Sequence, residues 1–384
     1  MTSQNRRPTM KDNQAKYPQL RFKGFTDPWE ERKLADVVSI SAGGDVDKTK
    51  LIEDGGYPVL ANALTNSGIV GYYDSYKVEA PAVTVTGRGD VGHAVARHVN
   101  FTPVVRLLSL KSEVLDADFL ANMLNQTNIL VESTGVPQLT APQLGSYKIL
   151  YPNLNEQTKI GKLLNAFDNL IALHQRKLDL LKEQKKGYLQ KMFPKKGEVV
   201  PEIRFPGFTD AWEQRKVGEL YKVTRGQVLA TSKTTPEKVG KNQYPVYSSQ
   251  TKNDGLMGYY SDYLFDTAIT WTTDGANAGT VNFRPGKFYS TNVNGVLLSA
   301  DGLANKAMAE NLNRSAWKWV SHVGNPKLMN NVMSQISVMI PVNLSEQEKI
   351  SEFLMMIDNT IALHQRKLDL LKEQKKGFLQ NMFV

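Results

Sequence analysis

One 17-residue segment occurs twice in this 384-residue chain without any difference. Ile171–Gly187 and Ile361–Gly377 both read IALHQRKLDLLKEQKKG. An identical copy of this length means that the chain is built from two copies of one unit. Any fold proposed for it must therefore accommodate an internal repeat.

The similarity between the copies is strong in some blocks and faint in others. Arg21–Leu34 matches Arg204–Val217 at 10 of 14 positions. Leu154–Asn169 shares its pattern with Leu344–Asn359, and the GYY segments Gly71–Tyr73 and Gly258–Tyr260 correspond. The remaining sequence is barely alignable. The repeat thus divides into copied parts and diverged parts.

The copied parts predict two long helices. From Leu154 to Met192 the apolar residues recur at steps of three and four, and the second copy repeats this. About 39 residues would give a helix of roughly 58 Å. We expect Asn155 to cap the first helix, Ser345 and Glu348 to form a capping box on the second, and a local stutter between His174 and Leu178.

The apolar seam of each helix is narrow, so each needs one partner helix. The obvious partner is the other copy, and a pseudo-two-fold relation would set the two antiparallel. The predicted seam residues are Leu163, Phe167, Leu170, His174, Leu178 and Leu181 in the first helix and Phe353, Ile357, His364, Leu368 and Leu371 in the second.

The diverged parts look globular. They contain short alternating segments such as Ala82–Thr86 and Ala94–Val99, separated by Gly, Asn, Ser and Thr turns. The predicted fold class is α+β, with two globular domains separated by two long antiparallel helices in a coiled coil. The expected boundaries are a tail at 1–17, domains at 18–152 and 196–342, and helices at 153–195 and 343–384.

Composition excludes several classes of protein. The chain has no cysteine, which excludes disulfide frameworks and thiol nucleophiles and is typical of a reducing compartment. No apolar run reaches the ~18–20 residues of a membrane span. We therefore expect a cytoplasmic protein that does not associate with membranes.

The net charge of +9 suggests an anionic partner. Residues 171–196 carry +6 and residues 361–384 carry +3, so the two copied helices account for all of it. Cations at helix C-terminal ends also favour the helix dipole, and the charge is therefore consistent with phosphate contact, with protein docking or with simple solvation.

Catalytic and metal-binding motifs are absent. Gly87–Gly92 fits GxGxxG, but a strand-like segment follows it where a dinucleotide site needs a helix, so we interpret it as a hairpin turn. The chain has no HExxH, GxSxG or Walker motif. We expect neither a metal site nor catalytic residues.

Nucleic acid is the commonest anionic partner of a basic protein, and the polar loops of the two domains are then the candidate DNA-reading elements. Asn and Gln suit adenine edges, whereas Arg and Lys suit guanine edges or phosphates. For any single residue a solvated turn is also a sufficient explanation. The candidates are Lys48, Lys50, Asn62, Thr65, Asn66 and Arg88 in the first domain and Arg225, Gln227, Lys233, Ser249, Gln250 and Lys252 in the second.

Together these motifs resemble those of the specificity subunits of type I restriction–modification enzymes. The resemblance is carried by the GFTD-x-WE-x-RK openings, by the GYY segments and above all by the paired LxEQxKI…IALHQRKLDLLKEQKKG helices. It covers nearly the whole chain after the tail. It implies that each domain is a target-recognition domain for one half of a split double-stranded DNA site, and that the helices fix the spacer.

The resemblance also implies partners. Two methylation subunits would dock on the helices, bring S-adenosylmethionine and methylate adenine, and motor/nuclease subunits using ATP and Mg would cleave unmodified DNA. DNA-mimic inhibitors from phage are a further implied class. The chain lacks the [ND]PP[FY] motif of amino-methyltransferases, so catalysis is assigned to the partners.

Two further hypotheses are compatible with the residues alone. A coiled-coil scaffold whose globular ends bind proteins would show the same repeat. A self-sufficient enzyme with an unfamiliar site is the third hypothesis, although no residue pattern favours it.

Overall fold

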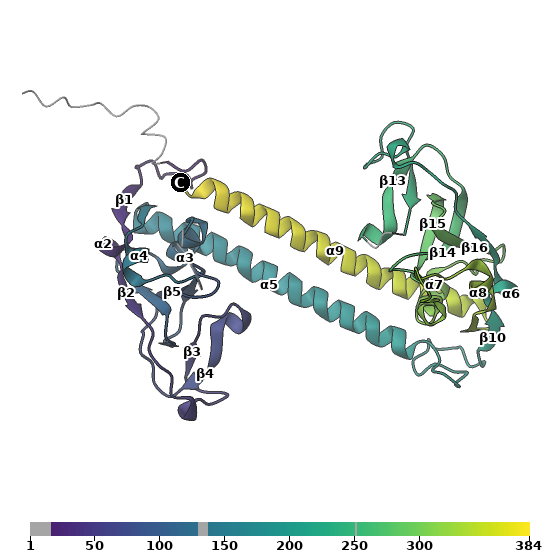
Figure 1. The fold of residues 1–384 in the computed structure, drawn as a ribbon, viewed down its shortest axis with the longest axis horizontal. Helices are drawn as coiled ribbons and strands as arrows, with labels where there is room; N and C mark the ends of the chain where they lie inside the picture. Colours follow the sequence, from purple (N-terminus) through teal and green to yellow (C-terminus); the bar gives the residue numbers. More distant parts are fainter. Residues whose placement is uncertain (1–16, 130–136, 250–251) are drawn as a thin grey trace, which may run out of the picture. The chain divides into compact units, whose positions relative to one another are not determined.

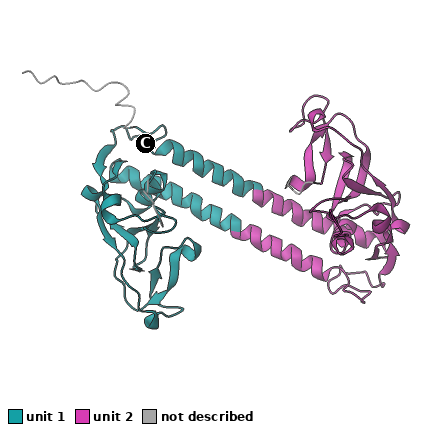
Figure 2. Ribbon diagram, in the orientation of Figure 1, with its two compact units in different colours: residues 1–175, 366–384 teal, residues 176–365 magenta. Residues whose placement is uncertain are grey.

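The computed structural model describes residues 17–129, 137–249 and 252–384. The chain divides into two compact units (Figure 2). Unit 1 comprises Met1–Gln175 with Arg366–Val384, and unit 2 comprises Arg176–Gln365. Each unit therefore contains one globular domain and a part of each long helix, as the repeat requires.

The domain of unit 1 is built on three small antiparallel or mixed sheets. Their strand orders are β1-β9, β2-β8-β5-β6 and β4-β3-β7. The elements are β1 (Glu30–Lys33), α2 (Leu34–Val37), β2 (Ser39–Ala42), η1 (Lys48–Lys50), β3 (Tyr57–Leu60), η2 (Thr65–Gly68), β4 (Ile69–Tyr73), β5 (Ala82–Thr86), β6 (Ala94–Arg97), β7 (Thr102–Pro103), β8 (Leu107–Lys111), α3 (Ala117–Gln126), α4 (Ala141–Gly145) and β9 (Lys148–Tyr151).

The domain of unit 2 has a two-stranded sheet, β10-β17, and a six-stranded sheet of order β11-β16-β14-β15-β12-β13. The elements are β10 (Glu213–Lys216), α6 (Val217–Leu220), β11 (Lys222–Arg225), η3 (Thr231–Lys233), β12 (Tyr244–Tyr247), η4 (Lys252–Gly255), β13 (Leu256–Tyr260), β14 (Phe265–Thr272), β15 (Val281–Ser290), β16 (Asn294–Leu298), α7 (Lys306–Asn313), η5 (Ala316–Trp319), α8 (Asn330–Gln335) and β17 (Ser337–Ile340).

The two domains share one strand topology although their sequences have diverged. The order β2-β8-β5-β6 of unit 1 corresponds to β11-β16-β14-β15 of unit 2. The long strand β15 continues to a parallel pairing with β12, just as β7 pairs in parallel with β3. The register is also shared, because Arg97 lies opposite Ala82 and Arg284 lies opposite Ala268. The predicted hairpin around Gly87–Gly92 is confirmed, since it joins the antiparallel pair β5 and β6.

Each domain places one helix against its sheet. In unit 1 the side chain of Asp116 caps α3 by accepting a hydrogen bond from the Phe119 amide at 3.0 Å. Phe119 and Leu120 of this helix and Val83 and Val85 of β5 are all buried in one core. In unit 2 Asn305 caps α7 in the same way. Burial of these apolar side chains drives the helix onto the sheet.

The two copied segments form the long helices α5 (Leu154–Lys191) and α9 (Leu344–Met382), which Figure 1 shows. Within unit 1 the rings of Phe167 and Phe378 lie 5.3 Å apart, and Ile160 and Leu164 share a core with Met382. Residue numbers rise along one helix as they fall along the other. The helices are therefore antiparallel, as predicted. Among the helices of the described ranges, none is both long and apolar enough to span a membrane.

The predicted stutter is wrong, and so is the seam residue Leu170. The predicted residues Leu163 and Phe353 are half-buried, beside the fully buried seam positions Leu164 and Leu354. Leu170 is 44% exposed, whereas Leu164, which was not predicted, is fully buried. Ile171 is half-buried and continues the seam instead. Counted this way, the steps alternate strictly between three and four over the whole helix. The seam runs through Leu164, Phe167, Ile171, His174, Leu178, Leu181, Lys185, Tyr188 and Met192, and through Leu354, Ile357, Ile361, His364, Leu368, Leu371, Lys375, Phe378 and Met382.

The predicted caps are also wrong. Asn153 Oδ1 accepts a hydrogen bond from the Glu156 amide at 3.1 Å, and Asn343 Oδ1 accepts one from the Ser345 amide at 2.9 Å. Asn153 and Asn343 lie just before the helices and are equivalent in the repeat. An Asn in the N-cap position satisfies amides that the first turn leaves free.

Candidate nucleic-acid interface

A buried ion pair attaches each domain to the start of its own long helix. Arg21 donates from Nε and Nη2 to the two carboxylate oxygens of Glu156, at 2.8 and 2.6 Å. Arg204 makes the same two contacts with Glu346, at 2.6 and 2.8 Å. Both glutamates have side chains with no exposed area. This bidentate contact explains why the RF-x-GFTD opening and the EQ dipeptide of the helix are copied together.

In unit 1, four of the predicted DNA-reading residues are exposed and available. These are Lys48, Lys50, Thr65 and Arg88. Lys50 lies 3.4 Å from Asp47 in an exposed ion pair, which contributes little and leaves the ammonium free to exchange partners.

The two predicted asparagines of unit 1 have structural roles. Asn62 Oδ1 accepts from the Gly87 amide at 2.8 Å, and its Nδ2 donates to the Val105 carbonyl at 3.1 Å. Asn66 Nδ2 donates to the Ile69 carbonyl at 3.2 Å. Asn62 therefore joins the loop after β3 to the β5–β6 hairpin, and its amide is occupied on both ends.

In unit 2 the predicted residues lie on separate loops. Arg225 ends β11 and donates to the Asn292 carbonyl at 2.9 Å. Gln227 and Lys233 are exposed, and Ser249 is half-buried. Lys252 begins the short helix η4, and Gln250 lies outside the described residues. Whether any of these twelve residues touches a base remains a prediction.

A turn with left-handed backbone geometry occurs at the same place in both domains. Asn66 has φ 48° and Ser67 has φ 51°, and their equivalents Asn253 and Asp254 have φ 49° and 51°. Residues other than glycine seldom adopt this conformation, and it clusters at functional sites. The turn thus keeps its strained shape in both copies while the residue at its second position changes from serine to aspartate.

Behind this turn in unit 1 lies a small cavity of about 120 Å³ that contains a half-buried arginine. Arg97 Nε donates to Thr84 Oγ1 at 2.9 Å. Burial lowers the pKa of the Arg97 guanidinium to about 10. Among the described residues no carboxylate lies within ion-pair distance of it. A buried cation without a counter-charge is costly, and it is therefore a functional candidate.

Unit 2 has the equivalent cavity, of about 90 Å³. Arg284 donates from Nε to Thr270 Oγ1 at 3.2 Å and from Nη2 to the Asp254 carbonyl at 2.5 Å. Its guanidinium carbon lies 3.8 Å from the centre of the Tyr247 ring. Burial lowers the pKa of Arg284 as well. The arginine therefore braces the left-handed turn from behind.

Neither arginine was among the residues predicted from the sequence. The pattern Ala-x-Thr-x-Thr occurs at 82–86 and again at 268–272, and an arginine follows 13 or 14 residues after the first threonine. This signal could have been found, but the insertion between the two parts hides it in a direct alignment. The shared strand register makes the equivalence plain.

Unit 2 also contains a cluster of four charged side chains between the helices and the domain. Lys185 of α5 lies 2.9 Å from Glu310 and 2.7 Å from Asp358. Lys306 of α7 lies 2.9 Å from Glu310 and 2.8 Å from Asp358. Burial would raise the pKa of Glu310, but the two lysines outweigh burial and lower it. Two positive and two negative charges leave this cluster neutral.

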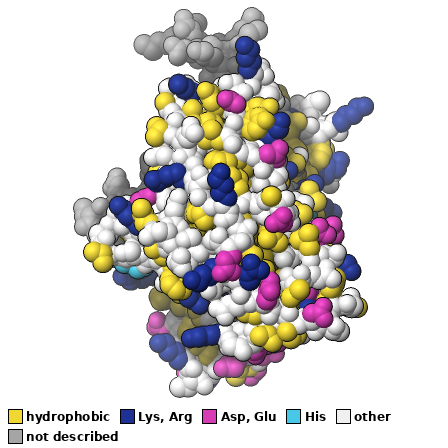
Figure 3. All heavy atoms as spheres, turned by 90° about the vertical axis from the view of Figure 1, so that its right-hand side faces the viewer, with side chains coloured by type: hydrophobic (Ala, Val, Ile, Leu, Met, Phe, Trp, Pro, Cys, Tyr) yellow, Lys and Arg dark blue, Asp and Glu magenta, His cyan; other side chains and the backbone are white. Residues whose placement is uncertain are grey.

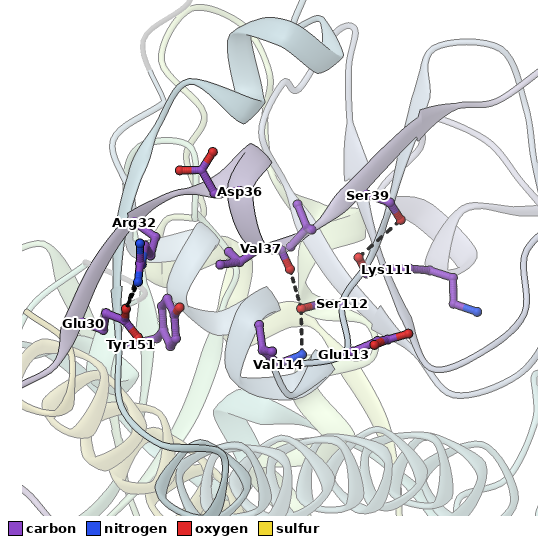
Figure 4. Close-up of a pocket in the computed structure, with 11 residues that line it drawn as sticks. Glu30, Arg32, Asp36, Val37, Ser39, Lys111, Ser112, Glu113, Val114 and Tyr151 are labelled. Carbon is purple, nitrogen blue, oxygen red and sulfur yellow. Dashed lines mark hydrogen bonds and ion pairs between the residues drawn. The ribbon is translucent and has the colours of Figure 1, made fainter.

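The cavity of about 790 Å³ drawn in Figure 4 is a poor candidate for binding DNA. It lies in unit 1 between β1, β2 and the end of β8. Glu30, Asp36 and Glu113 outnumber the cations Arg32 and Lys111 among its lining residues. Arg32 Nε donates to Glu30 Oε1 at 2.7 Å, so its positive charge is already paired.

The described residues contain no candidate metal cluster, and the face shown in Figure 3 carries no broad basic field. No group of three His, Asp or Glu side chains that could hold a metal ion occurs in the described part of the chain. On the face shown in Figure 3, cationic and acidic side chains are interspersed with uncharged ones. Recognition by local loop residues is consistent with such a surface.

Comparisons with known proteins agree with this architecture. The family model for the type I restriction modification DNA specificity domain matches residues 26–183 and again residues 209–373. A Mycoplasma pneumoniae protein described as a type I specificity subunit is 32% identical over 223 residues, covering 57% of this chain and 78% of that protein. Another from the same organism is 33% identical over 215 residues, covering 55% and 81%.

A solved structure has the same fold. The crystal structure of the type I restriction–modification system S subunit from M. genitalium matches with a TM-score of 0.75 at 15% identity, covering 96% of this chain and 99% of that one. The protein-binding scaffold hypothesis is not favoured by these matches. With two specificity domains, each joined to its long helix, the chain belongs to the family of type I restriction–modification DNA specificity subunits.

Proposed function

We propose that this chain is a non-catalytic subunit that reads a bipartite DNA site, with one half read by each domain. Helices α5 and α9 set the spacer between the half-sites and dock two methylation subunits. Those partners supply S-adenosylmethionine and methylate adenine, and ATP- and Mg-dependent subunits cleave unmodified DNA. DNA-mimic inhibitors would compete for the same surfaces.

The observation that carries this proposal is that the two copies share exposed residues as well as buried ones. The 17 identical residues include exposed positions that helix pairing does not constrain. Leu173 is 63% exposed and its copy Leu363 is 66% exposed; Leu180 and its copy Leu370 are 53% and 52% exposed. Exposed leucines that are repeated in kind and in exposure fit one type of partner that binds twice.

The domains support the other half of the proposal. They share strand order, register, the left-handed turn and an arginine that donates to the equivalent threonine, yet their loop residues differ. A common framework with different loops is what two different half-sites require. Catalysis is assigned to partners because the sequence contains no amino-methyltransferase motif.

The test is a domain exchange. Residues 198–340 are replaced by the corresponding domain of a subunit with a different target, and the chain is expressed with its methylation subunits. We expect single-molecule methylation mapping to show one new half-site, one unchanged half-site and the same spacer. Changes in both half-sites, or in neither, would contradict the division of labour.

A further inference from the structure

Unit 2 contains a groove of about 800 Å³ that the domain and the long helices line together. One wall consists of residues of α5 and α9, and the other consists of α7, the start of β15 and the turn at Asp254. All of these residues belong to unit 2. The buried arginine Arg284 lies in the same wall as the turn.

The cations that line this groove are of two kinds. Lys185 and Lys306 are neutralised by Glu310 and Asp358, which also line the groove. Their charges are therefore not available to an incoming ligand.

Lys182, Lys186 and Arg314 form the second kind. Within the described ranges, neither Lys182 nor Arg314 has a carboxylate within ion-pair distance. Lys186 has only Glu183 at 3.8 Å, and both side chains are well exposed. Such a pair is worth little in water. Lys182 and Lys186 of the helix wall and Arg314 of the domain wall thus line the groove without effective counter-charge.

The position of Arg314 is fixed by packing. It follows the last residue of α7, and its guanidinium carbon lies 5.1 Å from the centre of the Phe193 ring. Burial lowers the pKa of Arg314, as expected for a cation without a nearby acid. Lys182 and Lys186 lie one helical turn apart, about 6 Å along α5. The three charges are therefore spread along the groove.

We propose that this groove binds the phosphate backbone of DNA beside the half-site read by the domain of unit 2, with Lys182, Lys186 and Arg314 as the phosphate contacts. The proposal rests on the proposed function, in which the domain of unit 2 reads one half-site. The turn at Asp254 forms part of the domain wall of the groove. A duplex read at that turn brings its backbone to the lysines opposite.

An acidic surface of a partner protein is the alternative occupant, and the lining argues against it. The helix wall is identical in both copies, but the domain wall is built from diverged sequence. A partner that docks twice in the same way cannot depend on a wall that differs between its two sites. The phosphate backbone has the same charge and spacing whatever the base sequence, and it tolerates such variation.

The test uses the complex with methylation subunits and a duplex that contains its site. The variant K182Q/K186Q/R314Q removes the three charges, and K177Q/K191Q/K196Q removes three exposed lysines of unit 2 that do not line the groove. Each phosphate contact contributes about 0.9 to the slope of log K against log salt. We expect the groove variant to lose roughly 2 to 3 from this slope and the control variant to keep it.

Binding of specific and unrelated duplexes should fall together, by about 10- to 100-fold at moderate salt, while the methylated sequence stays the same. K182R/K186R should retain the wild-type slope and shows that charge is responsible. An unchanged slope in the groove variant overturns the proposal, and so does loss of the methylation subunits from the purified groove variant. If the wild-type complex binds no specific duplex, the proposed function itself fails.

Discussion

Lys185 Nζ lies 2.7 Å from Asp358, and its copy Lys375 lies 2.6 Å from Asp168, which is the copy of Asp358. The repeat therefore makes the same interhelical ion pair twice. The surroundings differ, because the first pair also contacts Lys306 and Glu310, whereas Asp168 is half exposed. The same interhelical ion pair is thus expected to contribute more to stability in unit 2 than in unit 1.

We expect Glu310→Gln to destabilise unit 2 by about 3 kcal/mol, because it leaves two partly buried lysines with a single carboxylate. Asp168→Asn is the matched control in unit 1 and should cost about 0–1 kcal/mol, since its pair is exposed. Urea unfolding measures both, and hydrogen exchange should show the loss of protection concentrated in α7. Equal effects of the two substitutions on the free energy of unfolding would show that the cluster contributes no more than an exposed ion pair.

The same cluster predicts a pH dependence. Burial by itself would raise the pKa values of Glu310 and Asp358. Lys306 and Lys185 outweigh burial and lower both pKa values in the folded protein. Groups with a lowered folded pKa contribute stability above their unfolded pKa and lose it as pH falls through the folded value. The melting-temperature difference between wild type and Glu310→Gln should therefore shrink as pH falls below about 4. A constant difference from pH 6 to pH 3 would contradict this origin.

Loss of the buried arginine should affect one half-site at a time. Arg284→Leu removes the contacts to Thr270 and to the turn at Asp254, and we expect about tenfold weaker discrimination at one half-site only. Arg97→Leu should do the same at the other half-site. Methylation rates on oligonucleotides with one altered half-site provide the measurement. Equal loss at both half-sites for either variant would show that the arginines act only on stability.

The length of the helices should set the spacer. Antiparallel pairing places Leu181 of α5 level with Ile361 of α9, so one heptad must be inserted after each to preserve the seam. Seven residues add about 10 Å, which corresponds to about three base pairs. Methylome sequencing should show a longer spacer and unchanged half-site bases. Insertion in α5 alone breaks the register and serves as the control, with no methylated site expected.

The exposed leucines should determine partner stoichiometry. Leu173 and Leu370 lie in unit 1, and L173D/L370D places charges on that unit's copy of the surface. We expect native mass spectrometry to show one methylation subunit bound instead of two. Val239→Asp, at an exposed apolar residue of the unit 2 domain, should leave two bound. Retention of two partners by the leucine variant would place the docking surface elsewhere.

The sequence alone determined the repeat, the two long helices and their antiparallel pairing, because these follow from local periodicity and from the identity of two segments. It could not choose between Leu170 and Ile171 for the seam, since both are apolar and only packing against the second helix decides the phase. It also could not show that the Asn62 side chain is engaged in hydrogen bonds, because its partners Gly87 and Val105 come close to it only in the folded chain.

The equivalence of Arg97 and Arg284 could be established only from the tertiary structure. Each residue is plain in the sequence, but the segments around them have diverged and differ in length. Only the strand register, opposite Ala82 and Ala268, shows that they are the same residue in two copies. Hydrogen bonding between strands fixes that register across a long separation in the chain, which no local pattern records.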